Sequence, residues 1–501
     1  MIVLFGLQAS RSFFTKLMSS VMKAPMGFFD ATPSGRILNR ASTDMSVIDL
    51  DIPFTGSFFL GTGFDFLCIV IVVCIVTWKM ILVVVPALAL TQFVQNYNEA
   101  ALQQVNKINS TTKAPIVNKS AEALIGSATI RAFRQTERFK RQSLELIDKD
   151  TCAYVYKFSL VECKVLYIEL CSTVMLITAA CLITFNGNIS EGFTGLAVTY
   201  ALAFGNSLVA FCIQQTLLTV FIVSIERIRQ YLDLPREAPA VIESNRPPTN
   251  WPQRGEVLLD NLQIRYRENA PLVLKGISCT FQGGHKIGVV GRTGSGKTTL
   301  ISALFRLVEP ASGTICIDGI DICSIGLHDL RFKLGIIPQD PVLFQGTVRT
   351  NLDPLNQYMD SEIWEALRKS KLAELIEKLP RQLETPVKDQ GENWSAGQRQ
   401  LFCLGRVLLK RSQVLVLDEA TASIDSATNA FLQRVIRDEF SACTVITVAH
   451  RIPTVIDSDR VLALRDGVAV EYDSPKKLIE QKTSLFALLV AEYWAQAGGN
   501  I

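Results

Sequence analysis

The sequence predicts two domains, a polytopic α-helical membrane domain followed by an α/β domain of the soluble type. Three observations predict them: long apolar runs that end before residue 226, a proline-rich segment near residue 240, and alternating strand-like and helix-like segments after residue 255. With 501 residues, the chain is too long for one compact domain. Its 49% hydrophobic residues are many for a soluble protein, and its 19% charged residues are few. The net charge of +3 is small and gives no indication of nucleic-acid binding.

Four apolar segments are long enough to cross the hydrocarbon core of a bilayer, which takes roughly 20 helical residues. They are residues 54–77, 80–97, 165–185 and 192–225. Each could instead be a buried core helix, but four such runs in one half of the chain favour membrane spans. Residues 1–7 are apolar without a preceding basic region or a following cleavage site, so we interpret them as the tail of a longer apolar helix.

Basic residues predict the orientation of these spans. Residues 1–50 and 98–160 are rich in lysine and arginine, whereas the opposite turns contain only Lys79. Because cytosolic loops carry the excess of positive charge, both basic segments are predicted to be cytosolic. The glycosylation sequon at Asn188 then lies on the outer side, very close to the membrane.

Charged residues in or near the spans have two interpretations, because intramembrane charge is costly and usually faces a cavity or a partner. Glu162 and Lys164 lie near a helix end, where snorkelling to the interface accounts for them. Asp65 lies inside a span, and it is the better candidate for a side chain that faces a substrate path.

The proline-rich segment separates a partial membrane domain, residues 1–230, from an α/β domain, residues 255–501. We assign residues 231–254 to a linker because dense proline excludes helix. Alternating strands and helices after the linker indicate a parallel sheet covered by helices, and Asp466-Gly467 indicates a hairpin. Strands are predicted at 257–266, 286–290, 335–337, 414–417, 444–448, 460–464 and 468–472, and helices at 361–379 and 426–440.

The most informative motif is the string GRTGSGKT at residues 291–298, after the strand that ends at Val290 and before a helix predicted to reach Leu307. It fits the phosphate-binding P-loop. Its glycines let backbone N–H groups surround phosphates, and the helix dipole favours negative charge there. Lys297 is expected to reach the β- and γ-phosphates of ATP, and Thr298 to ligate Mg²⁺. The predicted phosphate-binding residues are Gly291, Gly294, Ser295, Gly296, Lys297, Thr298 and Thr299.

A second element is the apolar run 414–417 followed by Asp418 and Glu419. Ligands of parallel α/β sheets bind at the carboxyl ends of the strands, where Asp418 emerges. There Asp418 can hold Mg²⁺ through water, and Glu419 can polarise the attacking water. Without a P-loop, a core strand ending in solvated acids would be a sufficient interpretation.

The string NWSAGQ at residues 393–398 resembles the signature motif of ABC ATPases, usually written L-S-G-G-Q. Trp394 and Ala396 replace its leucine and first glycine, whereas Ser395, Gly397 and Gln398 are retained. The resemblance implies that these three residues contact ATP bound by a partner domain. Kinases and helicases share the two preceding elements but not this one.

Other segments resemble parts of the same family in chain order. Tyr266 resembles the aromatic residue that stacks on adenine, with local packing as the alternative. Gln339 resembles the Q-loop glutamine that contacts Mg²⁺ and faces the membrane domain, residues 422–425 resemble the D-loop, and His450 resembles the switch histidine. The resemblance thus implies the catalytic set Glu419, His450 and Gln339, and the Mg²⁺ set Thr298, Gln339 and Asp418.

The membrane part is similar to the second membrane domain of the multidrug-resistance-associated (subfamily C) ABC transporters. Residues 24–40 and 122–133 resemble their first and second cytosolic loops, which couple to the nucleotide-binding domains. The resemblance covers nearly the whole chain and looks closest to plant members. It implies a C-terminal half of ABC exporter type, in which family members have six spans. Because only four are complete here, we expect a truncated chain.

The resemblance implies ATP-driven export of amphipathic organic anions, including glutathione conjugates, in a vacuolar or plasma membrane. ATP and Mg²⁺ are the implied cofactors. The implied partners are the bilayer, an organic anion and a second membrane and nucleotide-binding half, whereas nucleic acid is not a predicted partner. Two alternatives stay open: a channel regulator or gated channel of the same family, and a non-transporting fragment that retains ATP binding.

Overall fold

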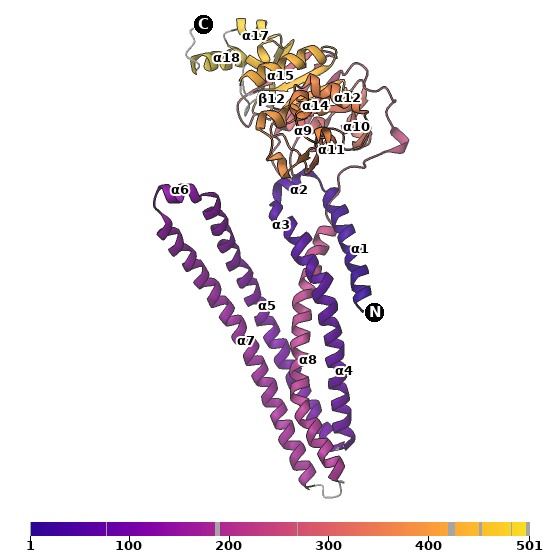
Figure 1. The fold of residues 1–501 in the computed structure, drawn as a ribbon, viewed down its shortest axis with the longest axis vertical. Helices are drawn as coiled ribbons and strands as arrows, with labels where there is room; N and C mark the ends of the chain where they lie inside the picture. Colours follow the sequence, from indigo (N-terminus) through magenta and orange to yellow (C-terminus); the bar gives the residue numbers. More distant parts are fainter. Residues whose placement is uncertain are drawn as a thin grey trace. The chain divides into compact units, whose positions relative to one another are not determined.

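The computed structural model describes residues 2–76, 78–185, 191–267, 269–418, 426–449, 453–481 and 483–496. The chain divides into two compact units (Figure 1). The first unit comprises Met1–Met22 and Ser34–Leu234, and the second comprises Lys23–Pro33 and Pro235–Ile501. Residues 23–33, which contain the short helix α2 (Met26–Ala31), therefore belong to the second unit although they precede most of the first.

The first unit is helical. Helix α5 packs along α7, and α4 packs along α8. The helices approach closely where side chains are small, because a Cβ on Gly205 of α8 would lie 2.7 Å from Ser172 Oγ of α7. Its helices are α1 (Ile2–Met22), α3 (Ser34–Asn39), α4 (Ile52–Val76), α5 (Ile81–Ile125), α6 (Ser127–Ala132), α7 (Thr136–Phe185) and α8 (Glu191–Leu232).

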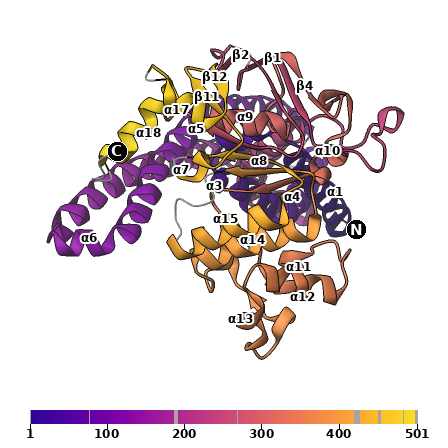
Figure 2. The same cartoon turned by 90° about the horizontal axis from the view of Figure 1, so that it is seen from above.

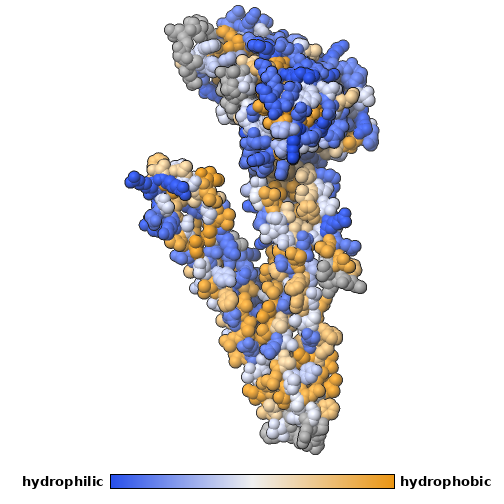
Figure 3. All heavy atoms as spheres, viewed as in Figure 1, coloured by the Kyte–Doolittle hydropathy of each residue, from blue (hydrophilic) through white to orange (hydrophobic). Residues whose placement is uncertain are grey.

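Within the described part of the chain, three helical stretches are long and apolar enough to cross a membrane: Ser34–Ile75, Trp78–Ile125 and Gly192–Leu232. They contain three of the four predicted spans, except the last two residues of the span 54–77. The remaining one, residues 165–185, is helical as part of α7 but is not among the three, so its role as a span stays a prediction. Hydrophobic side chains cover much of the surface of these helices (Figure 3).

The predicted cytosolic segment 98–160 is itself almost entirely helical. It consists of the end of α5, the short helix α6 and the start of α7. At 1.5 Å per residue, the 45 residues of α5 span roughly 68 Å, more than twice the hydrocarbon thickness of about 30 Å. One continuous helix is therefore long enough for both an apolar span and a long extension beyond it.

The main sheet of the second unit has six strands in the order β12-β11-β3-β10-β9-β6. Its edge strand β12 lies beside β11 (Figure 2). Neighbouring strands are parallel except β11 and β12, which form the predicted hairpin with positive φ at Asp466 and Gly467. The strands are β3 (Lys286–Val290), β6 (Leu334–Ile337), β9 (Val414–Asp418), β10 (Thr444–Val448), β11 (Arg460–Arg465) and β12 (Val468–Asp473).

Both faces of this sheet are buried. Val414 and Val416 of β9 pack in the core that contains α9 and the antiparallel sheet. Leu415 and Leu417 point to the opposite face and pack with residues of α14 and α15. This alternation, with period 2, places helices over both faces. The covering helices are α9 (Lys297–Leu304), α10 (Leu327–Lys333), α14 (Ala396–Lys410) and α15 (Ser426–Glu439).

A separate antiparallel sheet has the order β2-β1-β4-β5, and of its strands only β1 was predicted. The predicted helix 361–379 is two helices, because Lys371 between them has a φ of 56° and interrupts the helical backbone. The P-loop helix α9 also ends earlier than predicted, before Arg306 with a φ of 47°. These elements are β1 (Val257–Ile264), β2 (Leu274–Phe281), β4 (Ser312–Ile317), β5 (Ile320–Asp321), α12 (Asp360–Lys369) and α13 (Ala373–Glu377).

Candidate functional site

The predicted motifs meet at one edge of the parallel sheet. Asp418 at the end of β9 is paired with Val448 of β10, and Val448 is paired with Val289 of β3. On the other side of β9, Leu417 is paired with Ile337 of β6. The segments that follow these strands, which carry the P-loop, Asp418 and Gln339, therefore emerge side by side at the carboxyl edge.

The P-loop depends on glycine at two positions. Gly296 caps α9 with a φ of 101°, and a Cβ there would lie 2.5 Å from a methyl carbon of Leu274. A Cβ on Gly291 would lie 2.5 Å from Ser295 Oγ and would also collide with the Leu464 carbonyl. Only glycine gives the loop this backbone conformation at this spacing.

Two polar side chains of the loop, Ser295 and Lys297, are buried. Lys297 is buried, and its Nζ donates hydrogen bonds to the carbonyl oxygens of Gly291 at 2.8 Å and Arg292 at 3.2 Å. Ser295 is 5% exposed, and its buried hydroxyl has no hydrogen-bond partner within the described chain. A buried hydroxyl without a partner is costly, so the loop has donor capacity that a phosphate oxygen would satisfy.

Tyr266 joins this group. Its hydroxyl lies 3.0 Å from Thr299 Oγ1, in the first turn of α9, and its side chain is 43% exposed. The structure therefore brings together Tyr266 and the predicted phosphate-binding residues, with a large aromatic surface left accessible. The residues present fit a purine nucleotide, with the ring near Tyr266 and phosphates in the glycine loop.

The residues predicted for Mg²⁺ lie at the same edge. Asp418 is half-buried, whereas Thr298 and Gln339 are exposed. Among the described residues, no group of three or more His, Cys, Asp and Glu side chains forms a metal-binding cluster. One carboxylate, one hydroxyl and one amide fit Mg²⁺, which proteins usually bind through one or two carboxylates together with substrate phosphates.

The signature segment begins helix α14. Ser395 Oγ accepts a hydrogen bond from Gln398 N at 3.2 Å, and Gln398 Oε1 accepts one from Ser395 N at 2.9 Å. This capping box fixes the helix N-terminus, next to Gly397. Trp394 is 6% exposed and packs against Phe402 in a separate apolar core.

Two residues of α14 that sequence reasoning did not assign hold the neighbouring segments. Gln400 is buried and donates to the Pro338 carbonyl, next to Gln339, at 3.1 Å. Arg406 donates to the carbonyl oxygens of Val342 at 3.0 Å and Asn351 at 2.6 Å. The sequence feature that could have identified Gln400 and Arg406 is their polar character within a helix that is otherwise rich in apolar residues.

Some predicted residues lie outside the described residues: Glu419, His450, the segment 422–425 and Asn188. Their roles stay predictions. Of the charged residues near the spans, Glu162 and Asp65 are exposed in this structure. The snorkelling interpretation is wrong for Lys164, which is 3% exposed and donates from Nζ to Thr216 Oγ1 of α8 at 2.6 Å. The Lys164 ammonium therefore has its polar partner in Thr216 of α8 and not at the membrane interface.

Comparisons with known proteins agree with this architecture. The family described as ABC transporter matches residues 274–422, and the family described as ABC transporter transmembrane region matches residues 1–160. A solved structure, "Structure of a bacterial Atm1-family ABC exporter with ATP bound", shares the fold with a TM-score of 0.82 and 22% identity. The alignment covers 99% of this chain and 86% of that chain.

Curated relatives match along the whole sequence. "ABC transporter C family MRP4" of Zea mays is 50% identical over 98% of this chain, and "ABC transporter C family member 5" of Arabidopsis thaliana is 49% identical over 100%. The chain covers 33% of each, so it spans about a third of the length of these relatives. The transmembrane family match and the apolar helices indicate a multi-pass membrane protein. The chain contains an ABC transporter transmembrane region and an ABC transporter ATPase region, and its resemblance to the plant C-family members is confirmed.

Proposed function

We propose that this chain binds ATP at the P-loop and, with a second nucleotide-binding half, hydrolyses it to drive transport across a membrane. The observation that supports this most directly is the glycine loop at the carboxyl edge of the sheet, with Lys297 buried inside it. The accessible face of Tyr266 beside Thr299 supports adenine as the base.

Each residue of the site has a role in this proposal. The backbone N–H groups of the loop and Lys297 bind the phosphates, and Ser295 supplies a hydroxyl donor. Thr298, Gln339 and Asp418 would hold Mg²⁺, which neutralises phosphate charge. Glu419 acts as the base that orients water, and His450 contacts the γ-phosphate. Ser395, Gly397 and Gln398 close over ATP bound by the partner half.

The proposed substrates are amphipathic organic anions, with glutathione conjugates as the first candidates, in a vacuolar or plasma membrane. The resemblance to C-family members supports this class. ATP can drive such transport only if it binds one conformation of the membrane helices better than the other.

A Lys297→Met variant tests ATP binding. Removing a charge-assisted contact worth about 1.5–3 kcal/mol weakens the affinity for ATP by roughly 10- to 150-fold. The measurement is equilibrium titration of the purified full chain with a fluorescent ATP analogue and Mg²⁺. Lys476→Met changes an exposed lysine of the same domain and serves as the control. Equal ATP affinity in wild type and Lys297→Met would contradict the proposed site.

Transport is tested with the chain co-expressed with a second half in inverted vesicles. ATP-dependent uptake of a labelled glutathione conjugate, lost in Glu419→Gln, supports export. ATP-dependent electrical conductance without uptake would instead support the channel alternative.

A further inference from the structure

The segment predicted as a linker is bound along helix α10. The first backbone N–H groups of α10 donate to linker carbonyls, Leu327 N to Pro239 O at 3.1 Å and His328 N to Ala240 O at 2.8 Å. A Cβ on Gly326 would lie 2.5 Å from the Ala240 carbonyl, so the two backbones are in close contact. These carbonyls satisfy N–H groups that no side chain caps. The linker is therefore attached to the nucleotide-binding domain at a defined place.

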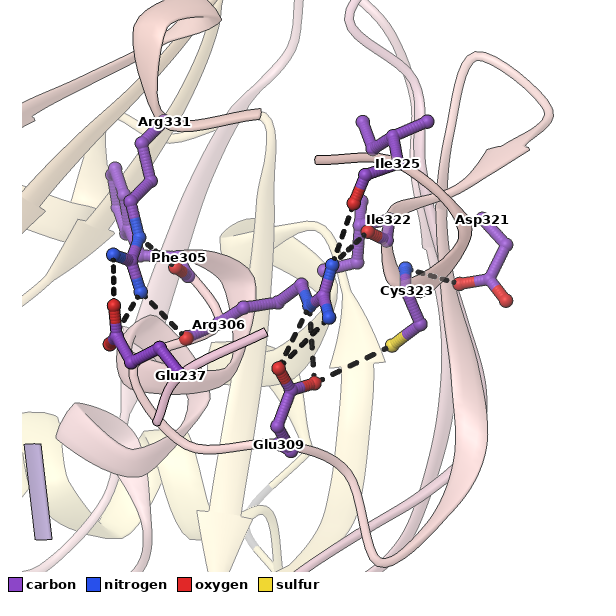
Figure 4. Close-up of polar contacts among 9 residues, drawn as sticks. All are labelled: Glu237, Phe305, Arg306, Glu309, Asp321, Ile322, Cys323, Ile325 and Arg331. Atoms are coloured by element: carbon purple, nitrogen blue, oxygen red, sulfur yellow. Dashed lines mark hydrogen bonds and ion pairs between the residues drawn. The ribbon is translucent and has the colours of Figure 1, made fainter. Parts of the chain in front are cut away.

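An ion pair strengthens this attachment (Figure 4). Arg331 of α10 donates to both carboxylate oxygens of Glu237 in the linker, from Nη1 at 2.9 Å and from Nη2 at 3.0 Å. The backbone N–H of Glu237 donates to the Lys23 carbonyl at 2.8 Å, at the start of the segment that contains α2. Neither side chain is fully exposed, and the two-pronged geometry fixes the orientation of the guanidinium.

The same guanidinium binds the far end of the P-loop helix. Arg331 Nε donates to the Phe305 carbonyl at 3.0 Å, and Nη2 donates to the Arg306 carbonyl at 2.8 Å. These carbonyls directly follow the last residue of α9, Leu304. A cation at a helix C-terminus is favourable, because the last carbonyls carry partial negative charge and have no partner inside the helix.

That end of α9 is held rigidly. The side chain of Arg306 is buried and donates from Nη1 to the carbonyls of Ile322 and Ile325, both at 2.9 Å (Figure 4). Its Nη2 donates to Glu309 at 2.9 Å. The backbone of Arg306 has a positive φ, which these contacts maintain. These contacts give the end of α9 a defined position relative to Arg331.

The signature helix reaches α10 as well. Lys410, the last residue of α14, donates from Nζ to the carbonyls of Arg331 at 2.9 Å and Leu334 at 2.6 Å. The C-terminal ends of both helices that begin at nucleotide-contacting motifs, α9 and α14, are thus bonded to α10. The linker is bonded to the same helix, which makes α10 the common support.

We propose that Arg331 is a positioning residue that couples the linker to the P-loop helix through its simultaneous bonds to Glu237 and to the Phe305 and Arg306 carbonyls. A change in the linker alters the position of α9 and thereby the affinity of the P-loop for ATP. By reciprocity, ATP binding changes the stability of the linker contact by the same factor. The inference rests on the proposed function, because it uses ATP binding as its readout.

A double-mutant cycle tests the coupling in the purified full chain, with the fluorescent ATP analogue at a temperature well below the melting transition. Glu237→Gln and Arg331→Gln are each expected to change the ATP affinity by about three- to ten-fold. Glu237→Gln combined with Arg331→Gln gives no more than the larger single effect, because both remove one shared interaction. Arg331→Lys keeps the charge but not the two-pronged geometry, and it restores the affinity only in part.

A matched control lies in the same domain. Arg349 forms a similar fork with Asp360, at 2.6 and 3.0 Å, without a bond to the end of α9. Asp360→Asn is expected to leave the ATP affinity unchanged. A lower melting temperature in Glu237→Gln with wild-type ATP affinity would overturn the inference, because Arg331 would then be only a structural tie. Failure of the wild-type chain to bind ATP in a Lys297-dependent manner would overturn the proposed function itself.

Discussion

Trp394 stands where the family signature has leucine, and its indole ring is buried rather than turned to solvent. The ring lies edge-on to Phe402 with a centroid distance of 4.9 Å, in an apolar core with Leu343, Ile363 and Leu367. The tryptophan therefore acts as an anchor that holds Ser395 at the start of α14.

Trp394→Ala is expected to destabilise this core by about 3–5 kcal/mol, the usual cost of removing a large buried aromatic side chain. Because a protein with two units need not unfold in one step, hydrogen exchange of the α12 to α14 amides is the appropriate measurement. Trp394→Phe is the control. It is expected to cost much less, because the buried indole Nε1 has no hydrogen-bond partner within the described chain. Equal protection in Trp394→Ala and wild type would contradict the anchoring role.

Lys410 gives a pH-dependent contribution to stability. Burial lowers the pKa of its ammonium group to about 8 from the usual value near 10.5. Because the folded state loses the proton at lower pH than the unfolded state, the unfolded state binds more protons between these values. The free energy of unfolding therefore rises as the pH increases from about 8 to 10.5. Lys410→Met is expected to remove the contribution of Lys410 to this slope, measured as the pH dependence of hydrogen-exchange protection in α10 and α14. An unchanged slope would assign it to another group.

Much of the site could be predicted residue by residue, because the P-loop is a contiguous string whose chemistry is local. Tyr266 and Thr299 were each assigned from local motifs, whereas the contact between their hydroxyls is tertiary and was not predicted. Gln400 and Lys164 could not be predicted, because their partners, Pro338 and Thr216, are distant in the sequence. The sequence around a polar side chain on a helix does not indicate which distant backbone group or hydroxyl the side chain will contact.

Among the elements, helix α18 (Leu485–Gln496) packs against the end of β3, the strand that leads into the P-loop. Phe486 and Val490 are buried in one cluster with Val290, the residue directly before the loop, and with Val455. Glu471 of β12 fixes the start of this helix, because its carboxylate accepts hydrogen bonds from Leu485 N and the Ser484 hydroxyl.

Phe486→Ala is expected to cost about 3–5 kcal/mol in local stability and to weaken ATP binding, because the support of Val290 is lost. Leu488 lies in the same helix with 52% of its surface exposed, so Leu488→Ala provides the matched control. Hydrogen exchange of β3 and titration with the ATP analogue measure the two effects. Normal ATP affinity in a destabilised Phe486→Ala variant would show that α18 does not position the loop.

The elements that the sequence predicted well are the buried parallel strands, because a run of apolar residues between turn signals marks them. Strands β2 and β4 lacked this signal. Gly276 interrupts β2 with a φ of 90°, and only the second half of β4 is buried. In α4 and α8 the strong apolar composition predicted the helices, but their pairing with each other is a tertiary property.

At the scale of the whole molecule, the signature residues of this chain bond to one another and, through Gln400, to the backbone beside Gln339. Ser395 is exposed at the helix N-terminus, as the proposed contact with a phosphate of the second half requires. This arrangement supports a composite site completed by a second half.

The chain alone is therefore expected to bind ATP but to turn it over little faster than Glu419→Gln does. Co-expression with a second membrane and nucleotide-binding half is expected to raise ATP turnover, measured as phosphate release from purified material. A Ser395→Arg variant should retain ATP binding and lose this gain, because the bulky side chain obstructs the surface facing the partner. Full turnover by the chain alone would contradict the composite site.

The length of α5 has a mechanical consequence. Roughly 68 Å of helix minus a hydrocarbon thickness of about 30 Å leaves an arm of about 38 Å. A tilt of about 10° at the bilayer then moves the tip near α6 by roughly 7 Å, the full pitch of a helical turn or more. Because α7 packs along α5, the two helices are expected to move together as one rigid pair. Small rearrangements among the apolar spans are thereby magnified at the tip.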